Sequence, residues 1–307
     1  MGRLDETSAG MSPEGRTGEE QMPVIIGYVI VLGAVLGGFA LAGGHLAAIY
    51  QPLELLIIGG GALGAFIVSN PGKTLKSTLK AVPGLLKGSR FTKSLYMELM
   101  SMLYEVLTKI RKEGLMSIER DVEAPHESAL FSKYPQVSKD HHLLEFLTDY
   151  LRLMVSGNLN AHEIEALMDC EIETHHQEGE APASAIQKVA DGLPAFGIVA
   201  AVMGVVHTMA SVGKPPSELG MMIAHALVGT FLGILLAYGF VGPLASLLEA
   251  RVKEGSKQFE CIKVTLLASL NGYAPSIAVE FGRKILFSTE RPTFLELETH
   301  VKQAKAR

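Results

Sequence analysis

Two apolar runs decide the fold of this chain: LPAFGIVAAVMGVVH, from Leu193 to His207, and IAHALVGTFLGILLAYG, from Ile223 to Gly239. Neither run contains Asp, Glu, Lys or Arg. Each belongs to a span of about 20 apolar residues, the length of a helix that crosses the hydrocarbon core of a bilayer. A short polar loop, residues 213–218, joins the spans. The sequence therefore predicts a membrane protein with a transmembrane hairpin over residues 192–249.

A second pair of apolar segments precedes this hairpin. The first, Pro23–Gly44, carries no charge and has glycines on one flank, which suits close helix packing in lipid. The second, Pro52–Val68, is shorter and has Glu54 near its start. We expect that carboxylate at the membrane edge. Together the two segments predict another transmembrane hairpin over residues 22–69.

The remaining segments are polar. Residues 70–191 show amphipathic helical repeats and predict a compact cytoplasmic helical domain, and residues 250–307 predict a cytoplasmic tail. Nearly all Lys and Arg residues lie in these two segments, so we expect both of them and both termini on the cytoplasmic side. Residues 1–21 are either a disordered extension or precede a true start at Met22, and the pattern favours the second reading.

Composition and motifs argue against several classes of protein. A net charge of −5, with no basic cluster, argues against nucleic-acid binding. Gly59–Gly64 lacks the Gly-Lys-Ser/Thr ending of a phosphate loop. The two cysteines, Cys170 and Cys261, lie far apart without metal spacing, and adjacent histidines on a helix point apart. We therefore expect no enzyme, no catalytic residue, no metal and no cofactor.

Polar and helix-disturbing residues in the second hairpin are the features most suggestive of function. Pro194, Thr230 and Pro243 lie within apolar surroundings, where such residues usually face a bundle interior or an ion path. For Thr230, a hydrogen bond to its own helix is an equally good reading. No span holds Asp or Glu at depth, so a partner would have to supply the carboxylate of an ion path. Small residues also recur at helical spacing, as in close helix packing: Gly197, Ala201, Gly204, Ala226, Gly229 and Gly233.

A dense patch of both charges lies in the polar segment, at Lys109–Glu113 and Ser117–Asp121. A charge run is usually a solvated face. The alternative is a docking surface, where charges steer rapid association.

These features together resemble the flagellar stator family of motility protein A (MotA), in the MotA/TolQ/ExbB superfamily. The likeness rests on Leu193–His207, Ile223–Gly239, Gly157–Glu173 and Asn271–Pro275, and it extends from about residue 22 to the tail. It implies an all-α integral membrane protein of the bacterial inner membrane. Four transmembrane helices, with a helical cytoplasmic domain between spans 2 and 3, would assemble as a ring.

The resemblance also implies partners and an ion. Five copies would surround a MotB dimer, whose single membrane helix brings the proton-binding Asp. Pro194 and Pro243 match the family's functional prolines, and Thr230 matches the polar residue of the ion path. Ala201 stands where sodium-driven relatives tend to carry Thr, which favours H+ as the transported ion.

The resemblance changes the interpretation of the charge patch. Arg111 and Glu119 match the charges that engage the rotor protein FliG, so for these two the docking reading replaces the solvated face. Two other functions stay open. An ExbB/TolQ-like energiser of outer-membrane processes would have three spans, so the hairpin over residues 22–69 argues against it. A plain scaffold would not require Thr230 or the paired prolines.

Overall fold

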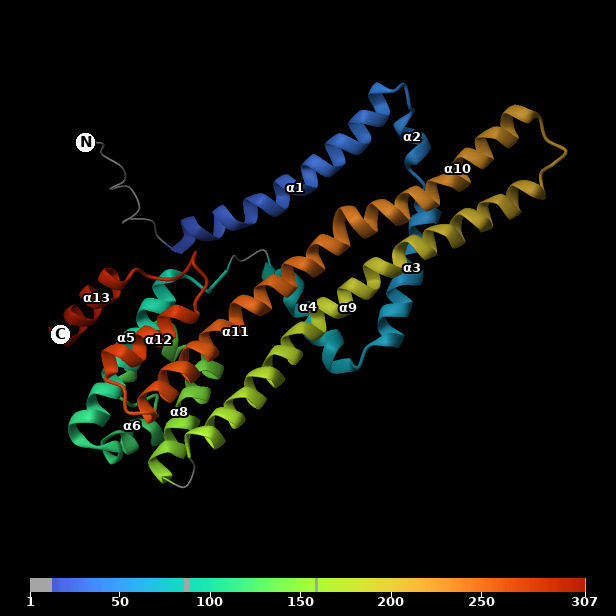
Figure 1. Cartoon of the computed structure of the whole chain (residues 1–307). Coiled ribbons are helices and arrows are strands. Elements are labelled where there is room, and N and C mark those ends of the chain that lie inside the picture. The colour runs from blue at the N-terminus through green and yellow to red at the C-terminus, as the bar shows by residue number, and fades with distance from the viewer. Residues whose placement is uncertain (1–12, 86–88, 158–159, 307) are drawn as a thin grey trace, which may run out of the picture. The chain divides into compact units, whose positions relative to one another are not determined.

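A computed structural model describes residues 13–85, 89–157 and 160–306, and in these ranges the regular structure is entirely helical (Figure 1). The all-α prediction is confirmed. The chain divides into two compact units. One combines the first 89 residues with Gly179–Ala250, and the other combines Arg90–Glu178 with Arg251–Arg307. The long helices α9 and α11 contribute to both units.

The first unit contains the apolar spans. Among the described residues, four helical segments are long and apolar enough to cross a membrane, as predicted: Met22–Leu41, Leu46–Ser69, Ala161–Met209 and Pro216–Leu270. The elements of this unit are α1 (Pro13–Leu41), α2 (Leu46–Ile49), α3 (Pro52–Ser69), α4 (Gly72–Leu85), α10 (Pro216–Ile234) and the π-helical η3 (Leu235–Val241), together with parts of α9 (Ala161–Met209) and α11 (Gly242–Leu270). Helix α1 begins ahead of the apolar run, and residues 1–12 of the N-terminal segment lie outside the described residues.

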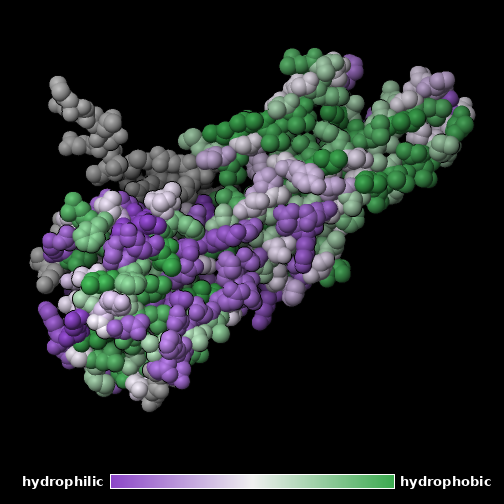
Figure 2. Space-filling model, in the orientation of Figure 1, coloured by the Kyte–Doolittle hydropathy of each residue, from purple (hydrophilic) through white to green (hydrophobic). Residues whose placement is uncertain are grey.

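Large apolar side chains of the spans point outward. Ile30, Val206 and Leu227 are each more than half exposed, and Figure 2 shows apolar surface along these helices. Small residues are instead among those buried between the spans, including Ala62 and Ala200. Helices in lipid pack in this way because close contact of their backbones, rather than removal of apolar groups from water, holds them together.

Helix α1 docks onto the π-helical segment. The Tyr28 hydroxyl donates a hydrogen bond to the Phe240 carbonyl oxygen at 3.1 Å, and the two rings stack with centroids 5.0 Å apart. A Cβ added at Gly239 would lie 3.0 Å from Cγ1 of Val31, so the absence of a side chain at Gly239 allows the two helices to approach closely here.

The second unit has an apolar core around α5 (Lys93–Glu113). The Thr92 side chain caps the helix by accepting from the Leu95 amide, and Gly114, with φ +86°, ends it in a conformation that few other residues adopt. The other elements are η1 (Leu115–Ile118), α6 (Glu119–Glu123), η2 (Phe131–Lys133), α7 (Pro135–Ser138), α8 (His141–Ser156), α12 (Pro275–Ile285) and α13 (Phe294–Ala306), with the remaining parts of α9 and α11.

Candidate functional site

Helices α9 and α10, the third and fourth spans, meet along a seam of small residues. A Cβ added at Gly197 would lie 2.7 Å from the carbonyl oxygen of Gly229, and one added at Gly204 would lie 2.7 Å from Cβ of Ala226. Real Cβ atoms do not tolerate such contacts, so the helices approach this closely because both carry glycine. The small-residue face expected from the spacing is therefore the contact surface of these spans.

Two of the predicted ion-path residues lie on this seam. The Cα atom of Thr230 is 3.4 Å from the ideal Cβ position of Gly197, and the amide nitrogen of Ala201 is 3.2 Å from that of Gly229. Both residues are half-buried. The seam thus brings Thr230 and Ala201 to neighbouring turns of facing helices, and their roles in conduction stay predictions.

The two predicted prolines flank the end of the seam that lies farther from the loop over residues 213–218. Pro194 lies inside α9, where it removes one backbone hydrogen bond. Pro243 is the second residue of α11, separated by one residue from the end of the π-helical segment, where the Gly242 amide donates to the Ala237 carbonyl. An ideal Cβ at Gly242 lies 3.9 Å from Cβ of Ala190, one turn before Pro194. Both prolines therefore disturb the paired helices at a similar level.

The position of Glu54 differs from the expectation that it lies at the membrane edge. A Cβ added at Gly229 would overlap its Oε2 atom, and one added at Gly204 would lie 3.8 Å from its Oε1. Gly229 lies roughly 20 Å along α10 from Pro216, at 1.5 Å per residue. The carboxylate thus lies alongside the middle of the fourth span, because the short α3 begins level with that region. Its depth could not be inferred from its place within its own span.

The charge patch separates into exposed and structural residues. Arg111, in the last turn of α5, and Glu119, the first residue of α6, are exposed, and neither forms an ion pair with another described residue. Asp121 accepts from Lys109 Nζ and Ser128 Oγ, both at 2.7 Å. Partial burial would raise the pKa of Asp121, but these hydrogen bonds outweigh it and hold the pKa below its usual range. Lys109 is therefore a structural residue, although the sequence suggests a solvated one.

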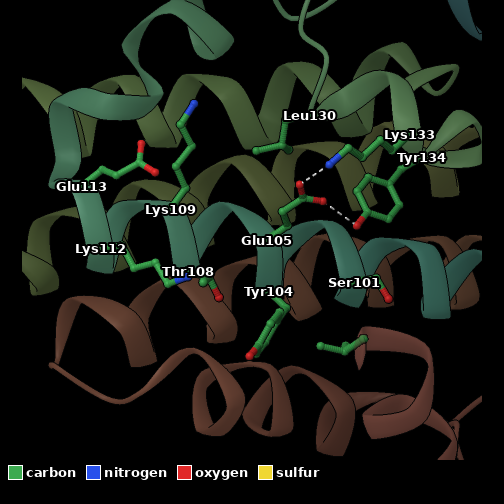
Figure 3. Close-up of a pocket in the computed structure, with 11 residues that line it drawn as sticks. Ser101, Tyr104, Glu105, Thr108, Lys109, Lys112, Glu113, Leu130, Lys133 and Tyr134 are labelled. Carbon is green, nitrogen blue, oxygen red and sulfur yellow. Dashed lines mark hydrogen bonds and ion pairs between the residues drawn. The ribbon is translucent and has the colours of Figure 1, made fainter. Parts of the chain in front are cut away.

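A cavity of about 290 Å³ lies beside this patch, on the face of α5 (Figure 3). Glu105 accepts a hydrogen bond from the Tyr134 hydroxyl at 2.9 Å and pairs with Lys133. Burial and the Glu105 contact raise the pKa of Tyr134. Three lysines and two glutamates share this cavity, which no sequence motif indicates. Its lining is Ser101, Tyr104, Glu105, Thr108, Lys109, Lys112, Glu113, Leu130, Lys133, Tyr134 and Val301.

Other titratable groups do not form a metal site. Within the described ranges, no group of three or more His, Cys, Asp or Glu residues is placed to hold a metal ion. Cys170 is exposed and Cys261 is buried, and both are free thiols. Burial raises the pKa of the Cys261 thiol to about 12.

Comparisons with known proteins cover nearly the whole chain. Residues 25–114 match the motility protein A N-terminal family, and residues 138–261 match the MotA/TolQ/ExbB proton channel family. Motility protein A of Salmonella typhimurium and that of Escherichia coli are each 57% identical, over 92% of this chain and 96% of theirs. Chemotaxis protein LafT of Vibrio parahaemolyticus is 40% identical, over 90% of this chain and 97% of its own.

Solved structures show the same fold. A chain of the C. jejuni MotAB structure superposes with a TM-score of 0.71 at 21% identity, over 87% of this chain and 96% of that one. A chain of the flagellar MotAB stator complex from Bacillus subtilis gives 0.67 at 26% identity, over 83% and 92%. From the identities and the family matches over both halves, this chain belongs to the motility protein A family, within the MotA/TolQ/ExbB proton channel family.

Proposed function

We propose that this protein is the stator subunit of a bacterial flagellar motor. With MotB it forms a proton-conducting complex that converts ion flow into torque on the rotor protein FliG. The observation that carries this proposal is the 57% identity with motility protein A over nearly the full length of both chains. The glycine seam supports it, because it brings Thr230 and Ala201 to neighbouring turns of two facing membrane spans.

Conduction requires a group that binds and releases protons, and MotB supplies an Asp for this purpose. A carboxylate that becomes protonated loses its need for water and can move against a small-residue face. Pro194 and Pro243 leave carbonyls free and weaken the helices at that level, which suits a change of contact. The membrane potential contributes about 2.3 kcal/mol per charge per 100 mV. Ala201, at the position of the sodium-associated Thr, favours protons over sodium.

Several copies of the chain, five in our proposal, surround the MotB dimer in the inner membrane. The outward-facing apolar side chains of α9 and α10 suit contact with lipid and with other membrane helices. Both termini and the charged unit lie in the cytoplasm, because the Lys and Arg residues are concentrated there. Exposed Arg111 and Glu119 then face FliG, where charged contacts form and break as the rotor passes.

The test is the swimming speed of a strain that depends on this protein. Swimming should survive removal of sodium and stop when an uncoupler collapses the proton gradient. Loss of swimming on sodium removal would overturn the choice of ion but keep the stator. If deletion of the gene leaves motility unchanged, the stator proposal is wrong and the ExbB/TolQ-like reading takes its place.

A further inference from the structure

We propose that Glu54 is a second proton-binding group of the ion path, supplied by this chain itself at the seam between the third and fourth spans. This inference rests on the proposed function as a proton-conducting subunit. It concerns a carboxylate distinct from the one that MotB is proposed to contribute.

The contacts of Glu54 define a notch for its carboxylate. Glu54 lies in the first turn of α3, and its side chain reaches the facing surfaces of α9 and α10. Gly229 leaves the space that Oε2 occupies, since a Cβ there would overlap this oxygen, and a Cβ at Gly204 would be in van der Waals contact with Oε1. The missing side chain at Gly229 thus makes room on the fourth span for a carboxyl group that comes from another span.

One oxygen of the carboxylate lacks a hydrogen-bond partner. Oε2 is inaccessible to solvent and has no hydrogen-bond partner within the described part of the chain. An ionised carboxylate with one oxygen buried and unpaired is costly, whereas the neutral acid costs far less. The notch therefore favours a carboxyl group that carries a proton, and losing that proton requires a cation or an acceptor nearby.

One titratable neighbour can serve as that acceptor. Among the described residues, His225 on α10 is the one whose charge acts on Glu54. On α9, Gly204 faces Oε1, and Ala200 lies 3.0 Å from the ideal Cβ position of Gly229; neither residue titrates. Imidazole exchanges protons near neutral pH. In one exchange a proton leaves the Glu54 carboxyl oxygen for an imidazole nitrogen of His225, and its return to the carboxylate restores the neutral acid and the neutral imidazole.

The position of the notch links it to the predicted ion path. Gly229, which bounds the notch, directly precedes Thr230 in the chain. The amide nitrogen of Ala201, the predicted path residue of α9, lies 3.2 Å from the ideal Cβ position of Gly229, so the notch adjoins this part of the predicted path. A carboxyl group that only fills space would work equally well as its amide isostere, and this difference makes the inference testable.

The experiment measures proton flux through vesicles that contain the full chain in complex with MotB. Glu54→Gln keeps the shape of the side chain but cannot exchange a proton, and we expect the flux to fall roughly tenfold or more. The matched control is Glu218→Gln, which alters an exposed carboxylate of α10 that pairs with Lys214 at 3.6 Å. The control should conduct like the wild type. Equal flux through Glu54→Gln and the wild type overturns the inference and leaves the proposed function intact.

Two further measurements cover the remaining outcomes. If Glu54→Gln does not assemble with MotB, Glu54→Asp is the variant to measure. We expect it to conduct protons with a shifted pH dependence of the flux. An unchanged pH dependence overturns the inference. Infrared difference spectra of wild type against Glu54→Gln should show the C=O stretch of a protonated carboxyl at neutral pH. Absence of this band also overturns the inference. Wild-type vesicles that conduct no protons contradict the proposed function, while the infrared band still reports whether Glu54 holds a proton.

Discussion

Single residues set how closely the spans approach and which groups lie between them. The spacing of Gly197, Gly204 and Gly229 predicts the small-residue face, because period alone decides which side of a helix they share. The depth of Glu54 could not be predicted, because it depends on the offset of one helix along another. That offset results from packing between distant segments, which no local pattern encodes.

Gly233→Ala should destabilise the seam. A Cβ there would lie 2.7 Å from the carbonyl oxygen of Leu193 and 2.9 Å from Cα of Gly197. These are backbone atoms, so the spans must move apart, at a cost of about 1–3 kcal/mol. Thermal unfolding of the detergent-solubilised complex with MotB should show a lower midpoint. Gly64→Ala, whose Cβ meets nothing within 4 Å, is the control, and an equal midpoint for both variants would contradict the close contact.

Arg111→Glu should lower torque without affecting assembly with MotB, because Arg111 is exposed and forms no ion pair with a described residue. The measurement is the rotation speed of tethered cells, which load the motor heavily. Lys112→Glu reverses the neighbouring exposed charge and should have little effect. A reversed charge on the facing surface of FliG should restore part of the torque. Full rotation speed of the Arg111→Glu motor under load would contradict the assignment of Arg111 as a contact to FliG.

At the scale of elements, packing decides features that the sequence pattern alone does not, and α6 is an example. Its orientation on α5 is held by the Lys109–Asp121 pair, which leaves Arg111 and Glu119 facing outward from neighbouring elements. The charge run predicts a patch, but only packing decides which charges are structural. The π-helical η3 was equally beyond prediction, because local sequence does not distinguish it from an α-helical continuation.

Asp121→Asn should change the pH dependence of stability in the second unit. The folded-state pKa of Asp121 is lowered, so its stabilising contribution is present above the ordinary carboxyl pKa and is lost as pH falls through the folded value. We expect Asp121→Asn to cost about 1–2 kcal/mol at pH 7 and little in acid. Chemical unfolding of the full chain at both pH values measures this. A constant difference between variant and wild type would contradict the ion-pair account.

Pro243→Ala should make the junction between η3 and α11 more regular. The new amide could donate to the Gly239 carbonyl, so the amides of Leu235–Val241 should exchange with deuterium more slowly. Hydrogen exchange followed by mass spectrometry reports this segment. The control is Pro275→Ala at the start of α12, where the missing amide has no helical partner in any case. Unchanged exchange over η3 would show that Pro243 does not maintain the π-helical turn.

At the scale of the whole molecule, the fold class could be predicted from the sequence, but the grouping of its segments into units could not. Four apolar spans and an all-helical fold follow from the length and hydropathy of each segment. The grouping of residues 251–307 with residues 90–178 depends on contacts distant in sequence, and the pattern within each segment gives no sign of it.

Labelling with a membrane-impermeant maleimide tests the topology. Ser217→Cys, in the expected outer loop region, should react in intact cells. Exposed Cys170 should react only after the membrane is opened. Cys261 should react only after unfolding, because the thiol is fully buried and its pKa is raised to about 12, so little thiolate forms. Labelling of Cys170 in intact cells would reverse the proposed orientation.

The notch at Gly229 also has an evolutionary consequence. Because a side chain at position 229 and the carboxylate of Glu54 compete for the same space, any substitution of Gly229 would displace the carboxylate from the notch, so we expect the two positions to vary together. Homologues with alanine or serine at 229 should carry a shorter residue at 54, and those that keep the acid should keep the glycine. Two residues far apart in the chain should thus be inherited as a pair.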